Sequence, residues 1–349
     1  MSKVILTGSQ GFIGSYVCKD LLDKGYEVIG IDNFSKYGEV SRPHDTHPNF
    51  KLVNLDLSGR PVVNINMWWP LAGAANISEL EDVEYVIAGA AMIGGISYFH
   101  KYAYDLLATN ERILANTFDL AIDLYKNHNL KKIVVLSSSM VFENTNQYPS
   151  EEDSIKFCPP PTSTYGFQKL ASEYFAKGAF EQYGLPYTII RPFNCVGVGE
   201  EDSISEEAVM SGNVKLMMSH VVPDLINKVL KGQDPLHILG EGNQVRCYTN
   251  GKDISRGIVT AMEHENALNE CFNISTAEAT TVLELAEKIW NKLNPNKEFN
   301  FTTEDPYVHD VQKRIPSVAK AEKLLDYKAS ISLDESLDEV IEYMKKKLG

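Results

Sequence analysis

The amino-acid sequence predicts an α/β fold in which a doubly wound parallel sheet is joined to a smaller, mixed C-terminal lobe. Short apolar runs alternate with helical patterns as far as about Pro192. The first run leads directly into a glycine-rich turn, and a later run ends in three consecutive serines. Ligands bind at the carboxyl ends of the strands in open parallel sheets, so both features are expected at one site.

The N-terminal segment has the pattern of a dinucleotide-binding unit. A strand is expected at residues 4–7, and a helix with apolar residues at three- and four-residue spacing follows the turn. Gly8 permits a tight turn, Gly11 lets backbone N–H groups approach a pyrophosphate, and Gly14 lets the helix pack against the strand. The order of these elements predicts a Rossmann-type fold, although the GxxGxxG spacing alone is weak support.

The next two strands extend the predicted cofactor site. Residues 27–31 lead into Asp32, whose carboxylate can accept hydrogen bonds from the adenosine ribose and would repel a 2′-phosphate. NAD is therefore favoured over NADP. A third strand at 50–55 ends in Asp56 and Leu57, which are candidate contacts on the adenine side. The alternative is that both aspartates are ordinary residues of strand-end turns.

Two further strands predict the catalytic end. A strand at 83–87 is followed by small residues from Ala88 to Gly95, which would let nicotinamide and substrate approach the backbone. A strand at 133–136 delivers Ser137, Ser138 and Ser139 to the ligand-binding edge.

Tyr165 and Lys169 are predicted to share one face of a helix that begins near Thr164, after three prolines that exclude a helix. Free tyrosine has a pKa of about 10, and a lysine ammonium together with the positive nicotinamide ring would favour the phenolate. A serine hydroxyl can share the substrate proton. The alternative is a surface pair, because YxxxK is common by chance, but its combination with Ser138 and the glycine turn is not.

These residues resemble the extended short-chain dehydrogenase/reductase family, specifically its NAD-dependent nucleotide-sugar epimerases and dehydratases. Residues 7–14 resemble the family's TGxxGFxG turn, and Asn110 matches an asparagine on the helix after the fourth strand. Residues 137–142 resemble its SSSxxVYG segment; counting back four from Phe142 makes Ser138 the catalytic serine.

The resemblance implies a role for each site residue. The catalytic residues are Ser138, Tyr165 and Lys169. The cofactor-binding residues are Gly8, Gly11, Phe12, Ile13, Gly14, Asp32, Asn33, Asp56, Leu57, Ala90, Tyr165 and Lys169. The substrate-binding residues are Ser139, Asn194, Arg246 and Arg314, in segments that resemble RxFNxYGP, GxGxQxRxF and the family's C-terminal substrate-binding stretch. The two arginines would bind the substrate phosphates, which suits bidentate guanidinium contacts.

Departures from the family pattern bear on the reaction. The family's dehydratases carry Asp-Glu after the catalytic serine or threonine, its decarboxylases keep the Glu, and its 3,5-epimerases use a cysteine near position 140. Here these positions are Ser139 and Met140, which cannot act as an additional acid or base. Residues 60–79, with Trp68 and Trp69, form a longer link than the family normally has.

The leading hypothesis is therefore a nucleotide-sugar epimerase acting at C4. Tyr165 would remove the hydroxyl proton while a hydride passes to NAD, and the keto sugar would turn over before the hydride returns to its other face. The alternatives are a 3,5-epimerase, a keto-sugar reductase or a 4,6-dehydratase with a relocated acid/base. A non-catalytic NAD sensor is a further class, but it would not need the intact set of Ser138, Tyr165 and Lys169.

Composition bounds the remaining expectations. We expect the chain to form two parts. The first is an NAD-binding domain at 1–192, to which the chain returns around 247–265, and the second is a nucleotide-sugar-binding lobe at 193–349. A net charge of −14 argues against nucleic acid or an anionic membrane as partner. Five scattered cysteines without a CxxC, no signal peptide and no long apolar run favour a cytoplasmic protein.

Three further expectations concern two helices, an acidic stretch and the histidines. The helices expected at 103–127 and 164–183 carry apolar residues on more than one face. The resemblance implies that these helices form the interface of a homodimer. The acidic stretch 200–207 is expected to be solvated surface, with a flap over the sugar as the alternative. The histidines show no metal spacing, so no metal is expected, and a structural role is favoured for His220.

Overall fold

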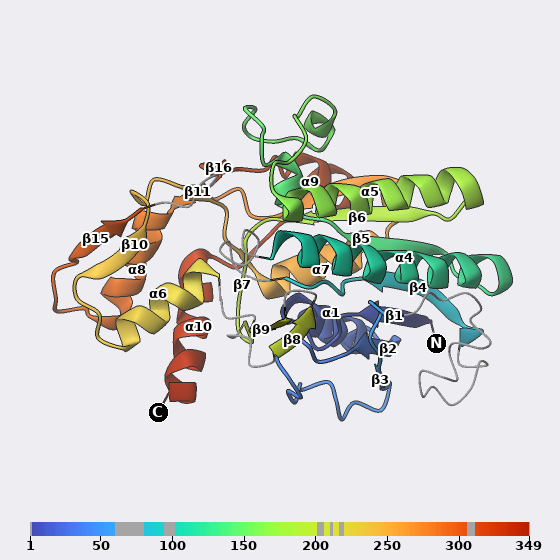
Figure 1. Cartoon of the computed structure of the whole chain (residues 1–349), viewed down its shortest axis with the longest axis horizontal. Coiled ribbons are helices and arrows are strands. Elements are labelled where there is room, and N and C mark those ends of the chain that lie inside the picture. The colour runs from blue at the N-terminus through green and yellow to red at the C-terminus, as the bar shows by residue number, and fades with distance from the viewer. Residues whose placement is uncertain are drawn as a thin grey trace.

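The computed structural model describes residues 2–59, 80–93, 102–200, 206–209, 212–215, 220–305 and 311–348. A seven-stranded parallel sheet forms the centre of its larger lobe (Figure 1). The strands are β1 (Lys3–Thr7), β2 (Glu27–Asp32), β3 (Phe50–Asn54), β4 (Val83–Ala88), β5 (Lys132–Leu136), β6 (Tyr187–Pro192) and β13 (Glu270–Ile274). They are arranged in the order β13-β6-β5-β4-β1-β2-β3. The order reverses between β1 and β4, which opens a crevice there. The predicted class of fold is confirmed.

Helices cover both faces of this sheet (Figure 1). Helices α4 (Ala103–Asn127) and α5 (Thr164–Tyr183) pack side by side on one face. Helices α1 (Phe12–Asp23), α7 (Gly251–Glu263) and α9 (Ala319–Leu325) lie on the other face. Because both faces are covered, strands such as β5 are apolar and buried at almost every position.

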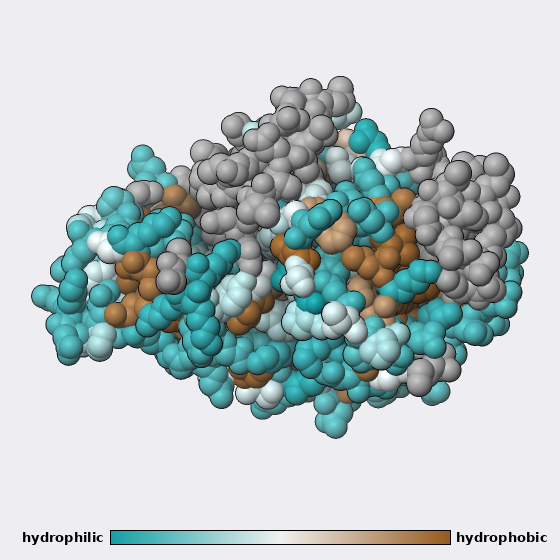
Figure 2. Space-filling model, turned by 90° about the horizontal axis from the view of Figure 1, so that it is seen from below, coloured by the Kyte–Doolittle hydropathy of each residue, from teal (hydrophilic) through white to brown (hydrophobic). Residues whose placement is uncertain are grey.

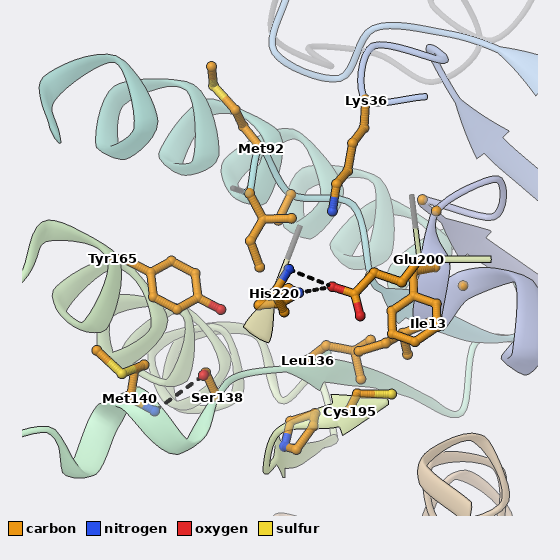
Figure 3. A pocket seen from close by; sticks show the side chains of 18 of the residues that line it. Ile13, Lys36, Met92, Leu136, Ser138, Met140, Tyr165, Cys195, Glu200 and His220 are labelled. Carbon is orange, nitrogen blue, oxygen red and sulfur yellow. Dashed lines mark hydrogen bonds and ion pairs between the residues drawn. The ribbon is translucent and has the colours of Figure 1, made fainter. Parts of the chain in front are cut away.

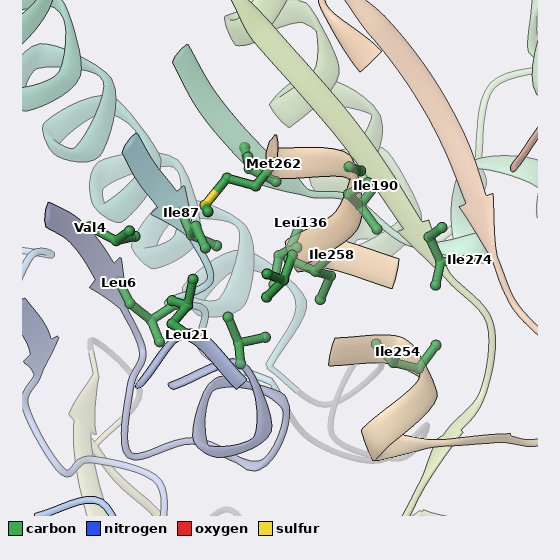
Figure 4. Packing of buried hydrophobic residues seen from close by; sticks show 14 of the residues in the cluster. Val4, Leu6, Leu21, Ile87, Leu136, Ile190, Ile254, Ile258, Met262 and Ile274 are labelled. Atoms are coloured by element: carbon green, nitrogen blue, oxygen red, sulfur yellow. The ribbon is translucent and has the colours of Figure 1, made fainter. Parts of the chain in front are cut away.

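The core between the sheet and α7 shows how distant parts of the sequence complete this lobe. Figure 4 shows Leu6 of β1 and Leu21 of α1 near Ile258 and Met262 of α7. All four side chains are fully buried. Burying an aliphatic side chain of this size contributes about 1.5–3 kcal/mol, so α7 is an integral part of the larger lobe.

The smaller lobe has its own core around Trp290. Its helices are α6 (Val221–Leu230), α8 (Val282–Leu293) and α10 (Leu333–Leu348). Its strands are the parallel pair β10 (Leu236–Leu239) and β15 (Phe301–Glu304), and the three-stranded set β14 (Thr280–Thr281), β11 (Val245–Arg246) and β16 (Lys313–Arg314).

Several short elements complete the structure. They are the strand pairs β7 (Cys195–Val196) with β12 (Thr249–Asn250) and β8 (Glu206–Val209) with β9 (Gly212–Lys215), and the 3₁₀ turns η2 (Ser139–Phe142), η3 (Glu152–Lys156) and η4 (Glu265–Ala267). Figure 2 shows a face that is largely hydrophilic, with apolar residues in separate groups. Among the described residues, no helix combines the length and apolarity that crossing a membrane requires.

The helices expected at 103–127 and 164–183 are confirmed with these bounds. Strand β13 was not anticipated, and it lies within the stretch assigned from the sequence to the second lobe. The division at residue 192 stays a prediction. Expectations for residues 60–79, including Trp68 and Trp69, and for Gly94, Gly95 and residues 201–205 of the acidic stretch lie outside the described residues.

Candidate active site

A cavity of about 790 Å³ lies at the carboxyl edge of the sheet and extends to the smaller lobe. Every residue that the sequence assigned to catalysis, cofactor or substrate lines it: Gly8, Gly11, Phe12, Ile13, Gly14, Asp32, Asn33, Asp56, Leu57, Ala90, Ser138, Ser139, Tyr165, Lys169, Asn194, Arg246 and Arg314. The structure brings these residues together, and their individual roles stay predictions.

The glycine turn leaves no room for side chains. Gly8 has a φ of +76°, and a Cβ there would lie 2.9 Å from the Ala90 backbone. A Cβ on Gly14 would lie 1.9 Å from the Gly8 carbonyl oxygen. Gly11 caps the N-terminus of α1, whose first turn has no acidic residue, so the positive end of the helix dipole is available to an anion. This geometry fits the pyrophosphate of a dinucleotide.

Asp32 is held at the end of β2 beside this turn. Its two carboxylate oxygens accept the N–H groups of Gln10 and Phe34, each at 2.9 Å. Burial raises the pKa of Asp32, while these hydrogen bonds and the charge of Arg42 act in the opposite direction. Each carboxylate oxygen can accept one more hydrogen bond, so the group can still receive ribose hydroxyls. Asp56 caps a turn through Ser58 and also lines the cavity.

Arg42 is a residue of this region that the sequence analysis missed. Its Nε and Nη2 donate to the Gln10 carbonyl at 3.1 and 2.9 Å, and its guanidinium lies over the Tyr37 ring. The long loop between β2 and β3 is thereby fastened to the glycine turn. No local motif marks this contact, because it joins residues that are distant in the sequence.

Asn110 fixes the loop that follows β4. Its side chain accepts the Met92 N–H at 2.6 Å and donates to the Met92 carbonyl at 2.9 Å. Asn110 is buried, and Met92 packs with Met140 and Tyr165. The asparagine noted in the sequence therefore positions one wall of the cavity beside the tyrosine.

Ser138, Tyr165 and Lys169 meet at the end of β5 (Figure 3 shows the first two). Ser138 caps η2 by accepting the Met140 N–H at 3.2 Å, and its hydroxyl acts to lower the pKa of Tyr165. Lys169 Nζ donates to the Leu136 carbonyl at 2.9 Å and lies 6.0 Å from the centre of the Tyr165 ring. All three side chains are buried.

The start of α5 sets the position of Tyr165. Ser163 is the N-cap and accepts the Gly166 N–H at 3.0 Å, and Glu143 accepts the Ser163 hydroxyl at 2.8 Å. A Cβ on Gly166 would lie 2.7 Å from the Glu143 carboxylate. The tyrosine thus projects from a helix end that is fixed by several hydrogen bonds.

The expectation that Lys169 and the nicotinamide ring together favour the Tyr165 phenolate stays a prediction. Burial raises the pKa of Tyr165 above its ordinary value, and the opposing influences come from Ser138 and Arg314. The Lys169 ammonium instead lies against the Leu136 carbonyl, and burial lowers its own pKa to about 8. Ser138 and Arg314 therefore favour the phenolate in addition to the effect predicted for Lys169.

Ser137 and Arg191 belong to the core beneath the site. The Ser137 hydroxyl donates to Glu173 Oε1 at 2.7 Å. Arg191 makes two hydrogen bonds of 2.8 Å with the same carboxylate, and both charged side chains are almost completely buried. This ion pair joins α5 to β6. Because the Ser137 hydroxyl is bound to the same carboxylate, Ser137 has a structural role that Ser138 does not share.

The substrate end of the cavity is cationic. Strands β11 and β16 pair in parallel with Arg246 opposite Arg314 in the register, and both residues line the cavity. Asn194 has a φ of +31°, and its buried side-chain oxygen has no partner among the described residues. Two arginines on neighbouring strands suit a diphosphate.

Glu200, His220 and Lys36 also line the cavity. Glu200 was expected in solvated surface, and that expectation is wrong: its carboxylate is buried against His220. Lys36 follows Asp32 closely in the sequence, which is the one local signal that could have placed it near the cofactor. The Glu200–His220 contact has no sequence signal.

A glycine turn that fits a pyrophosphate, a carboxylate that can accept ribose hydroxyls and a Ser–Tyr–Lys set in one cavity define a dinucleotide-dependent enzyme of the Rossmann class. The sequence model described as the NAD dependent epimerase/dehydratase family matches residues 4–275. The chain belongs to this family, and the predictions of the family and of NAD as cofactor are confirmed.

Several relatives match over nearly the whole chain. An uncharacterized UDP-glucose epimerase of Bacillus subtilis is 28% identical over an alignment of 349 positions that covers 98% of each chain. A UDP-N-acetyl-alpha-D-glucosaminuronate decarboxylase of Bacillus cytotoxicus is 24% identical and covers 99% of this chain and 98% of its own. Among solved structures, the UDP-glucose 4-epimerase of Thermotoga maritima with UDP-glucose is 26% identical, with a TM-score of 0.79 and coverage of 99% and 100%.

Proposed function

We propose that this protein is an NAD-dependent nucleotide-sugar epimerase that inverts C4 of a hexose. The observation that carries the proposal is that Ser138, Tyr165 and Lys169 line one cavity with the glycine cradle and two arginines. The similar UDP-glucose epimerases of Bacillus subtilis and Thermotoga maritima support the same reaction.

The chain's residues divide the work in this reaction. When bound, NAD supplies the oxidation chemistry, since its nicotinamide ring accepts a hydride and gives it back. Tyr165 takes the proton of the C4 hydroxyl and later returns it, while Ser138 holds the sugar oxygen and the phenol in one hydrogen-bonded line. Lys169, with a pKa of about 8, is mostly protonated at neutral pH, so its charge favours the phenolate as the proton leaves.

Arg246 and Arg314 bind the diphosphate and leave the sugar free to turn between oxidation and reduction. The register of β11 and β16 places these two residues opposite each other, so they can grip both phosphates. A grip on the nucleotide part alone is what C4 epimerisation needs, because the keto sugar must present its other face to the same cofactor.

The residues after the catalytic serine favour epimerisation over the alternatives. Ser139 and Met140 line the cavity at the positions where the resembling dehydratases and decarboxylases carry acids. Met140 packs against Tyr165 and offers no proton. Elimination or decarboxylation would therefore need an acid or base from elsewhere.

The proposal includes a homodimer formed through α4 and α5. Tyr104 on α4 and Tyr174 on α5 are 63% and 66% exposed, and Phe167 on α5 is also exposed. Exposed aromatic residues are enriched at interfaces between subunits. Light scattering of the purified protein would test this state. All five cysteines are free thiols, which suits an enzyme of cytoplasmic carbohydrate biosynthesis.

The test is proton NMR in D₂O with UDP-, GDP-, CDP- and dTDP-hexoses and catalytic NAD. A new 4-epimer without deuterium at C4 is expected, because the same hydride returns. Tyr165→Phe should lower the rate by about 10²- to 10⁴-fold. Failure of all four nucleotide classes, or net consumption of NADH with keto sugars, would overturn the proposal.

A further inference from the structure

A second titratable pair, Glu200 and His220, lies in the wall of the same cavity. Glu200 follows β7, and His220 is the N-cap residue of α6. The His220 ring Nδ1 is in direct contact with Glu200 Oε1, and the backbone N–H of His220 donates to the same oxygen at 3.3 Å. In Figure 3, His220 lies between the Tyr165 ring and Glu200.

The two members of this pair differ in exposure. The Glu200 side chain is 4% exposed, whereas the His220 side chain is 47% exposed. The carboxylate is therefore buried beneath the imidazole, and the imidazole is exposed to the solvent in the cavity. A carboxylate on Nδ1 fixes the proton there in the neutral ring, which leaves Nε2 as an acceptor. This is the arrangement by which a histidine is oriented as a general base.

The surroundings keep Glu200 ionised. Burial alone would raise its pKa, but His220 and Lys36 outweigh burial, so the pKa of Glu200 lies below its ordinary value. Figure 3 shows the Lys36 amine pointing toward the Glu200 carboxylate. An ionised carboxylate stabilises the imidazolium that forms when His220 receives a proton.

We propose that His220, oriented by Glu200, is a second acid/base that moves a proton on and off the carbon next to the oxidised C4. The inference rests on the proposed function, because it requires a 4-keto sugar. The C3 and C5 hydrogens of that ketone lie α to its carbonyl. His220 Nε2 takes one of these protons, the C–H electron pair forms a C=C bond, and the carbonyl pair moves to O4.

Ser138 and Tyr165 complete the proton transfer by donating hydrogen bonds to the enolate oxygen. The reverse movement of electrons returns a proton from His220 to the same carbon and restores the ketone. Hydrogen at C3 or C5 is thereby exchanged with solvent. Ser139 and Met140 cannot perform this step, so it needs a base outside the segment that follows the catalytic serine.

The experiment supplies UDP-4-keto-6-deoxyglucose directly to the NAD-loaded protein in D₂O and follows deuterium at C3 and C5 by NMR. The wild type should incorporate deuterium well above the enzyme-free rate, and His220→Ala should lower this rate by about 10²- to 10⁴-fold. Added imidazole should restore part of the loss in His220→Ala, which a purely structural histidine would not allow. His128→Gln, at the C-cap of α4, is the matched control and should exchange like the wild type.

Glu200→Gln should slow exchange while His220 remains in place. Exchange at the enzyme-free rate in the wild type, or undiminished exchange in His220→Ala, would overturn the inference. Because the ketone is supplied ready-made, either result is separate from a failure of C4 epimerisation, which is measured with the four nucleotide hexoses.

Discussion

The two edges of the sheet each hold a buried lysine at one end of β5. At the carboxyl edge, Lys169 donates to the carbonyl of Leu136, the last residue of the strand. At the amino edge, Lys132 is the first residue of the strand and donates to the Ala261 carbonyl near the end of α7 at 2.8 Å. Burial lowers the pKa of both lysines to about 8.

The two lysines have similarly lowered pKa values but different surroundings. Lys169 lines the cavity with Tyr165 and Ser138, whereas Lys132 satisfies a carbonyl in the last turn of a packed helix. A lowered lysine pKa therefore does not by itself identify a functional group. The neighbouring groups decide whether the charge acts on a substrate or holds a helix.

Replacing each lysine by methionine should give the largest difference in kcat between the two edges. Lys169→Met should lower kcat by about 10²- to 10⁴-fold, because the group that favours the phenolate is lost. Lys132→Met should leave kcat essentially unchanged. Steady-state kinetics with the sugar nucleotide identified by NMR measures both, and an equal loss in the two variants would contradict the distinction.

A buried ion pair beneath the carboxyl edge should matter for stability. Glu173→Gln leaves Arg191 charged and without its carboxylate in the core, and the free energy of unfolding should fall by about 3–5 kcal/mol. Urea denaturation measures the change. The double variant Glu173→Leu with Arg191→Met should recover most of the loss, and a single variant as stable as the wild type would refute this account.

A matched pair of glycines tests whether NAD binding at the carboxyl edge depends on close approach of the backbone. Gly14→Ala forces a methyl group against the Gly8 carbonyl, and overpacking of about 1–3 kcal/mol should weaken NAD binding by roughly ten- to hundredfold. A Cβ on Gly178 of α5 meets nothing within 4 Å, so Gly178→Ala should stabilise the protein by about 0.5–1 kcal/mol. Calorimetric NAD titration and thermal unfolding distinguish the two outcomes.

The pH dependence of stability tests both edges of the sheet together. Each lysine loses its proton near pH 8 when folded but near pH 10.4 when unfolded, so the unfolded state binds more protons between these values. Stability contributed by each group therefore rises with pH across this window, by up to about 1.4 kcal/mol per pH unit. Lys132→Met should flatten the rise measured in urea titrations, and an unchanged slope would show that the lysine titrates normally.

The cofactor half of the site could be predicted because its signals are local. Gly8, Gly11 and Gly14 sit in one short turn, and Asp32 ends the next strand. Steric limits at a glycine and the period of a helix are properties of neighbouring residues, so a single sequence displays them. The same reason explains why α4 and α5 were predicted with the observed bounds.

Contacts between distant segments could not be predicted in this way. Glu200 meets His220, Arg42 meets the Gln10 carbonyl, and Lys132 meets α7, each across a stretch of chain with no pattern of its own. The pKa of Tyr165 belongs to this class, because it depends on burial and on Arg314, which lies far along the chain. Only folding brings these groups together.

Strand β13 has a consequence for the order in which the protein is made. It forms one edge of the central sheet by pairing with β6, yet it ends at Ile274. Helix α9, which packs beside it, ends at Leu325. During synthesis, the NAD-binding sheet therefore cannot be completed until most of the chain has left the ribosome. The segments of the smaller lobe between β6 and β13 leave the ribosome before β13 does.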